Sequence, residues 1–167
     1  TLEGEQVRPT TDRVKESLFN ILQFQLEGRR FLDLFAGSGQ LGIEALSRGA
    51  TTCDFVDASP QAFAIVRENC RAARVEMKSK LHNCDAFAFL SAARGPFDLV
   101  LLDPPYGHGT LARVLPGLSR VVAPGGVVLC ESEREADLPE TAGELVRARQ
   151  YAYGKVLVTR YEKPRPE

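Results

Sequence analysis

Short apolar runs alternate with longer amphipathic segments along most of the chain. Continuous apolar runs such as Leu99–Leu102 suit strands that are buried on both faces of a parallel sheet. The pattern predicts strands at 30–34, 52–57, 80–84, 97–102 and 126–131, and helices between them at 40–48, 60–74, 86–93 and 109–121. Such alternation is typical of βαβ units, and therefore of a parallel sheet with helices on both faces.

The two ends of the chain depart from this alternation. A helix is expected over 12–26, because Asp12 can cap it and the leucines that follow fall on one face. Two β-rich stretches, 144–153 and 155–162, meet around Gly154 and predict an antiparallel hairpin. The predicted fold is a Rossmann-like α/β domain with a mostly parallel seven-stranded sheet. Residues 1–29 are expected to form an arm and helix, and 30–167 the main domain.

Composition narrows the function classes. The chain has 167 residues, 44% of them hydrophobic, which suits one soluble domain. Its apolar runs are too short for a membrane span, and its first residues lack the apolar centre of a signal peptide. The four cysteines have neither CxxC spacing nor a nearby histidine cluster, so we expect no metal site and a reducing, cytoplasmic location. Since the chain does not begin with Met, we expect a preceding segment.

A glycine-rich turn follows the first predicted strand. The sequence FLDLFAGSGQLG at 31–42 leads from a strand through glycines, which permit positive φ and a close approach of a ligand, into a helix. Gly37, Gly39 and Gly42 satisfy GxGxxG, and Asp57 ends the second strand, where a carboxylate can accept both ribose hydroxyls of an adenosine. These features fit NAD and S-adenosylmethionine equally.

Two further acids bear on the cofactor. Asp33, at the end of the first strand, can bind the amino acid portion of S-adenosylmethionine, whereas a dinucleotide needs the helix N-terminus free for its pyrophosphate. Asp33 therefore favours S-adenosylmethionine. Asp85, after the third strand, can accept the adenine amino group beside the Ala86 N–H, or can cap the helix that begins at residue 86. Both roles stay open.

The tetrapeptide Asp103-Pro104-Pro105-Tyr106 follows the fourth strand, where open α/β sheets bind ligands. The two prolines stiffen the turn. An exocyclic amine on a nucleobase is a poor nucleophile, because its lone pair is delocalised into the ring. Hydrogen bonds to the Asp103 carboxylate and the Pro104 carbonyl would localise that lone pair and aim it at a sulfonium methyl. Tyr106 can stack on the base. The alternative is an ordinary proline turn.

Three segments together resemble the RsmD family, the bacterial 16S rRNA guanine-N2 methyltransferases of the class I fold. They are RPTTDRVKE at 8–16, LDLFAGSG at 32–39 and DPPYG at 103–107, and the first is the most specific. The resemblance spans nearly the whole chain. It implies catalysis at Asp103, Pro104, Pro105 and Tyr106, an S-adenosylmethionine site at Asp33, Gly37, Gly39, Asp57, Asp85 and Ala86, and an arm whose Arg8 and Arg13 meet phosphate or carboxylate groups.

The resemblance also implies a substrate, a guanine of 16S rRNA of the guanine(966)-N(2) type. The net charge of −1 favours an assembled small-subunit intermediate over naked RNA, and we expect a monomer. The family's usual basic stretch before Arg8 is missing or shorter here. Three alternatives remain. The first is an amino-methyltransferase for another RNA or DNA base, such as DNA adenine, or for a protein amide. The others are a non-catalytic nucleotide-binding or RNA-binding module and an NAD dehydrogenase. Asp103 in place of Asn favours a base over an amide.

Overall fold

The strands and helices follow the predicted alternation. In the computed structural model, which describes residues 12–23, 25–93, 95–105 and 109–167, the strands are β1 (Arg30–Asp33), β2 (Thr52–Val56), β3 (Ser79–His82), β4 (Phe97–Leu102), β5 (Val122–Glu133), β6 (Thr141–Ala142), β7 (Leu145–Tyr153) and β8 (Val156–Glu162). The helices are α1 (Asp12–Leu22), α2 (Gln40–Ser47), α3 (Pro60–Ala72), α4 (Ala86–Ala92) and α5 (Thr110–Leu118).

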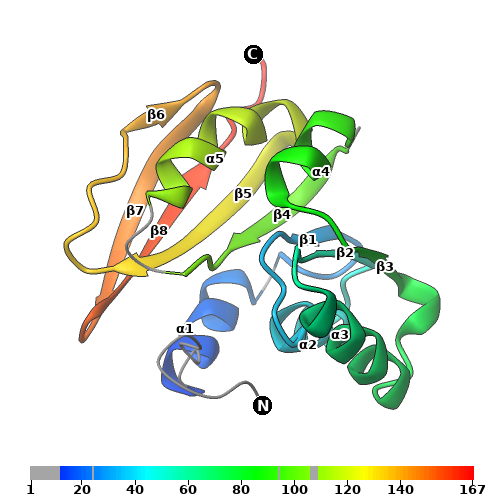
Figure 1. Ribbon diagram of the computed structural model, residues 1–167. Coiled ribbons are helices and arrows are strands. Elements are labelled where there is room, and N and C mark those ends of the chain that lie inside the picture. The colour runs from blue at the N-terminus through cyan, green and yellow to red at the C-terminus, as the bar shows by residue number, and fades with distance from the viewer. Residues whose placement is uncertain (1–11, 24, 94, 106–108) are drawn as a thin grey trace.

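All eight strands belong to one sheet, in the order β3-β2-β1-β4-β5-β8-β7-β6. The first five pair in parallel, and β8, β7 and β6 add to the β5 side as antiparallel strands. Helices α4 and α5 cover one face of the sheet, whereas α1, α2 and α3 lie on the other (Figure 1). The expected Rossmann-like α/β fold with a C-terminal antiparallel hairpin is confirmed.

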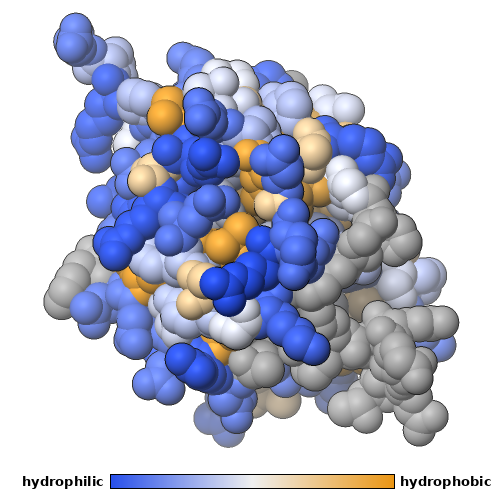
Figure 2. Space-filling model, turned by 90° about the vertical axis from the view of Figure 1, so that its left-hand side faces the viewer, coloured by the Kyte–Doolittle hydropathy of each residue, from blue (hydrophilic) through white to orange (hydrophobic). Residues whose placement is uncertain are grey.

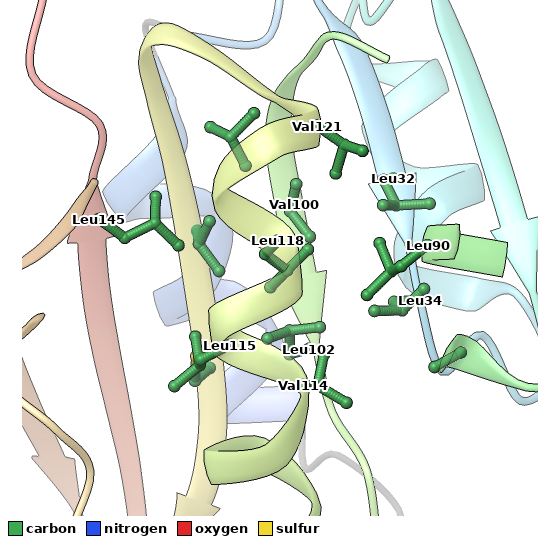
Figure 3. Packing of buried hydrophobic residues seen from close by; sticks show 14 of the residues in the cluster. Leu32, Leu34, Leu90, Val100, Leu102, Val114, Leu115, Leu118, Val121 and Leu145 are labelled. Carbon is green, nitrogen blue, oxygen red and sulfur yellow. The ribbon is translucent and has the colours of Figure 1, made fainter. Parts of the chain in front are cut away.

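Apolar packing on the α5 face holds strand β4 in place. Leu115 and Leu118 of α5 are fully buried, and they lie over Val100 and Leu102 of β4 (Figure 3). Leu145, at the start of β7, belongs to the same cluster, so the hairpin and the parallel sheet share one core. This packing fixes the carboxyl end of β4, from which Asp103 projects.

Most predicted boundaries agree with the structure to within three residues, and three larger differences remain. The sheet has eight strands because the two-residue strand β6, too short to give a period, pairs with β7. Strand β5 begins at Val122 and not at 126, since Ala123–Gly126 form an irregularity opposite Asp98 and do not end the strand. Helix α1 ends at Leu22, although Leu26 is buried as its apolar character suggests. In the described part of the chain, no helix has the length and apolar content that crossing a membrane requires.

Candidate active site

Two carboxylates meet where β1 and β4 end. The strands are parallel neighbours, with Asp33 in register with Leu101, so Asp103 follows two residues later at the same edge of the sheet. Asp33 is almost completely buried and Asp103 is half-buried. The predicted cofactor acid and the predicted catalytic acid are therefore brought together, as parallel pairing of adjacent strands requires.

Asp33 also caps helix α2. The N-cap residue, Gly39, has a left-handed backbone with φ 80° and offers no side chain to the first turn of the helix. The Gly42 N–H donates instead to the Asp33 carboxylate, at 3.3 Å. One of the free amides that a dinucleotide pyrophosphate would need is thus already occupied by an anion. This contact agrees with the preference for S-adenosylmethionine over NAD that the position of Asp33 suggests.

The environment of Asp33 is unfavourable for a negative charge. The pKa of its carboxyl is raised from the ordinary 3.8 to about 7. Burial is the main cause, and the negative charge of Asp103 is the second. The hydrogen bond from Gly42 acts in the opposite direction, and Asp57 adds a smaller repulsion. Perturbed pKa values of this kind are typical of functional sites, and a cationic ligand would favour the ionised form of the carboxyl.

Asp57 ties the glycine turn to the end of β2. One carboxylate oxygen accepts from the Gly37 N–H at 2.9 Å, and the other accepts from the Ser59 N–H at 2.9 Å. Gly37 has φ 57°, and a Cβ there would meet nothing within 4 Å, so the turn faces open space. Each carboxylate oxygen has a second lone pair, so this arrangement leaves acceptor sites for a diol.

Two asparagines that the sequence analysis did not identify support the same region. The side-chain amide of Asn69, on α3, donates to the Ser38 carbonyl at 2.8 Å. That of Asn83 donates to the carbonyls of Asp57 and Ala58, at 3.0 and 3.2 Å. Neither asparagine belongs to a local motif, and their partners lie more than twenty residues away.

Asp85 adopts the capping role that was one of its two expected roles. Its carboxylate accepts from the Ala88 N–H at 2.9 Å, at the start of α4. Ala86 is buried in the first turn of that helix. Asp85 is itself exposed, so a contact with an adenine amino group stays a prediction.

Of the remaining predicted residues, some lie among the described residues and others lie outside them. In the catalytic tetrapeptide, Pro104 is buried and Pro105 is exposed, while Tyr106 lies outside the described residues, as does Arg8 of the arm. Arg13 is exposed near the start of α1. Among the residues that the structure describes, no group of His, Cys, Asp or Glu could hold a metal ion.

Glu131 is a further acid at this edge that the sequence analysis missed. It lies one residue after Cys130, which pairs with Leu102, so the register places it beside Asp103 on the neighbouring strand. Its side chain is almost fully buried. A glutamate within the apolar run VVLCESE could have indicated it, because a charge at a central strand position is unusual.

A family model described as "Conserved hypothetical protein 95" matches residues 1–162. The chain is 41% identical over 165 residues to "Putative rRNA methyltransferase YlbH" of Bacillus subtilis, covering 96% of this chain and 90% of that protein. It is 32% identical over 159 residues to "Ribosomal RNA small subunit methyltransferase D" of Escherichia coli, covering 94% and 80%. The chain belongs to the RsmD family. The family membership predicted from the three sequence segments is thereby confirmed.

Solved structures agree with this assignment. "Putative methyltransferase yhhF from Escherichia coli" superposes with a TM-score of 0.85 at 32% identity, over 98% of this chain and 91% of that one. An RNA methyltransferase from Salinibacter ruber in complex with S-adenosyl-L-homocysteine superposes with a TM-score of 0.74 at 18% identity, over 96% of each chain. At that lower identity the second structure supports the methyltransferase fold alone.

The buried carboxylate makes a testable prediction for the ligand-free protein. Because the pKa of Asp33 is raised from 3.8 to about 7 on folding, its contribution to stability is complete below pH 4 and is lost as the pH rises through 7. Between pH 5 and 8 the free energy of unfolding of the wild type should fall by about 3 kcal/mol relative to Asp33→Asn. Urea unfolding of both proteins across this range measures the difference. Two parallel pH profiles would show that Asp33 ionises normally.

Proposed function

We propose that this protein transfers the methyl group of S-adenosylmethionine to the N2 amino group of a guanine in 16S rRNA, of the guanine-966 type. The observation that carries the proposal is the meeting of Asp33 and Asp103 at one edge of the sheet. Asp33 suits the binding of a cationic cofactor. Asp103 suits the binding of an amine that must be directed at the cofactor's methyl group. Membership of the RsmD family, with relatives named as rRNA methyltransferases, supports the choice of RNA.

The residues around the glycine turn fit S-adenosylmethionine. This cofactor has an ammonium group and a sulfonium centre, both cationic, and a ribose diol. The buried Asp33 lies where the positive charge would be stabilised, and a cation there would favour the ionised form of its carboxyl. Asp57 keeps acceptor capacity for the diol, beside the open face of Gly37. Gly39, Asp85 and Ala86 complete the predicted contacts. When bound, the cofactor supplies the electrophilic methyl group.

Asp103 and Pro104 would prepare the nucleophile. The two N–H groups of the guanine amine donate to the Asp103 carboxylate and the Pro104 carbonyl, which keeps the nitrogen lone pair out of the ring. The nitrogen would thereby be directed at the methyl group that the cofactor would supply, held beside Asp33 and Asp57. The nitrogen then loses one proton, for which the Asp103 carboxylate is the adjacent acceptor. Pro105 stiffens the turn, and Tyr106 would stack on the base.

The substrate is proposed to be a small-subunit assembly intermediate in the cytoplasm, bound by a monomer. Arg8 and Arg13, in the arm and helix of residues 1–29, would contact RNA phosphates near the domain formed by 30–167. A net charge of −1 is low for a protein that binds naked RNA unaided. Ribosomal proteins that help to present the base would reduce the need for a large basic surface.

Labelled methyl transfer tests the proposal directly. Small subunits or their precursors that lack the modification are incubated with the protein and methyl-labelled S-adenosylmethionine, and the RNA is digested to nucleosides. We expect the label in N2-methylguanosine. Label in another nucleoside would overturn the proposed target, and bound cofactor without transfer to any RNA would overturn the proposed activity.

Asp103→Asn separates chemistry from cofactor binding. The amide oxygen can still accept one hydrogen bond from the amine, but the negative charge of the carboxylate beside the amine is lost. We expect methyl transfer to fall at least a hundredfold while the affinity for S-adenosylmethionine changes little. Asp98→Asn is the matched control, because Asp98 lies on the same strand and accepts from the Arg30 N–H at 2.9 Å, near the opposite end of β4. Equal activities of the two variants would contradict the role of Asp103.

A further inference from the structure

The C-terminal hairpin is strongly basic although the whole chain is not. The two hairpin strands and their turn, residues 145–162, contain Arg147, Arg149, Lys155 and Arg160 and one acid, Glu162, whereas the complete chain has a net charge of −1. Tyr151 and Tyr153 in this stretch are partly exposed, whereas Tyr161 is fully buried. A mixture of cations and aromatic rings is typical of surfaces that bind single-stranded nucleic acid, where rings stack on bases and cations meet phosphates.

Four of these residues share one face of the hairpin. Arg149, Tyr151 and Tyr153 alternate along β7 and therefore project to the same side, and Arg160 of β8 lies directly opposite Arg149. We call these four residues the hairpin face. The guanidinium carbon of Arg149 lies 4.8 Å from the centre of the Tyr151 ring. Both tyrosines are half-buried against the cluster on the α1 side of the sheet, so their rings are held in place while part of each stays exposed.

The charges on the hairpin face are not balanced within the described part of the protein. Arg160 pairs with Glu162 at 2.8 Å, but Arg149 is exposed and has no ion pair among the described residues. Two cations that face each other across an antiparallel ladder repel each other, which costs stability. A polyanion on this face would relieve that repulsion. Figure 2 views the molecule from the side on which β7 lies and shows a largely hydrophilic surface with only separate apolar patches.

The hairpin face lies on the same side of the sheet as the candidate active site. Glu131 of β5 pairs with Val158 of β8, which pairs with Tyr151 of β7. Asp103 lies one strand beyond Glu131 in the same row. Neighbouring strands are about 4.8 Å apart, so Tyr151 lies about 15 Å across the sheet from Asp103. Glu131 and Val158, which lie between them, are buried, so a strand of RNA whose target base reaches Asp103 would pass over the elements that cover these two residues to reach the hairpin face.

We propose that the hairpin face binds the single-stranded RNA next to the target guanine. Tyr151 and Tyr153 stack on unpaired bases, and Arg149 and Arg160 contact the phosphates between them. The proposal rests on the proposed function, because it assigns the path of the same substrate. Charge and aromatic content favour RNA over a protein partner.

The test compares side chains that keep or remove the stacking ring. Binding of a short single-stranded RNA containing one guanine is measured by fluorescence anisotropy. We expect Tyr151→Leu and Tyr153→Leu each to weaken binding about tenfold or more, and Tyr151→Phe to bind like the wild type. The affinity for S-adenosylmethionine should stay unchanged in all three, which separates the loss of a base contact from a loss of folding. Unchanged RNA binding in both leucine variants would overturn the proposal.

A matched pair of arginines tests the phosphate contact. Arg67 lies over the Phe63 ring at 5.0 Å, which resembles Arg149 over Tyr151, but it is on α3 at the other end of the sheet. Arg149→Gln should weaken RNA binding and reduce the slope of log affinity against log salt by about 0.7, the value for one phosphate contact on a single strand. Arg67→Gln should change neither. Equal effects of the two variants would overturn the proposal.

Methylation by the wild type distinguishes failure of this inference from failure of the proposed function. If the wild type forms N2-methylguanosine in small subunits and the leucine variants do so equally well, only the hairpin face is wrongly assigned. If the wild type methylates no RNA, the proposed function fails first. Variants that bind the RNA normally but lose activity on assembled particles would indicate a protein partner on this face and would overturn the assignment to RNA.

Discussion

Parallel pairing of β1 with β4 is the constraint on which the rest of the site depends. It places Asp33 and Asp103 at one edge of the sheet, although they are seventy residues apart in the sequence. Burial of Asp33 and the negative charge of Asp103 raise the pKa of Asp33 to about 7. The apolar packing of α5 on β4 and of α1 on the opposite face keeps these strand ends fixed, so the two charges cannot move apart to reduce their repulsion.

A cationic ligand would stabilise the buried negative charge of Asp33, which is unfavourable in the ligand-free protein. The Gly42 N–H already stabilises the carboxylate, and a Cβ at Gly42 would come within 2.7 Å of the Cys53 sulfur, so this close approach of α2 to the sheet requires glycine. Asp57 fixes the turn between them through Gly37. The same edge extends through β5 and β8 to the hairpin face. In the proposed function, cofactor and target amine would meet at the ends of β1 and β4, and the flanking RNA would bind farther along the same row of the sheet.

The sequence was informative where the contacts are local. The strand–helix alternation, the glycine turn and the acids at the strand ends were all predictable, because each depends on periodicity or on residues close in the chain. Strand β6, the irregularity in β5 and the support of the turn by Asn69 depend on partners brought near by the fold. Glu131 was missed for the same reason, since only the register of β4 and β5 places it beside Asp103. The capping of α2 by Asp33 was not predicted, because only the fold places its carboxylate beside the Gly42 N–H.

The coupling between the two acids can be measured directly. Carbon-detected NMR of labelled aspartate side chains would follow the titration of Asp33 in the wild type and in Asp103→Asn. We expect a pKa near 7 in the wild type and a lower pKa in the variant, because the repulsive charge of Asp103 is removed while burial remains. A carboxyl that titrates near 3.8, or one with the same pKa in both proteins, would contradict the shared edge on which the proposed mechanism rests.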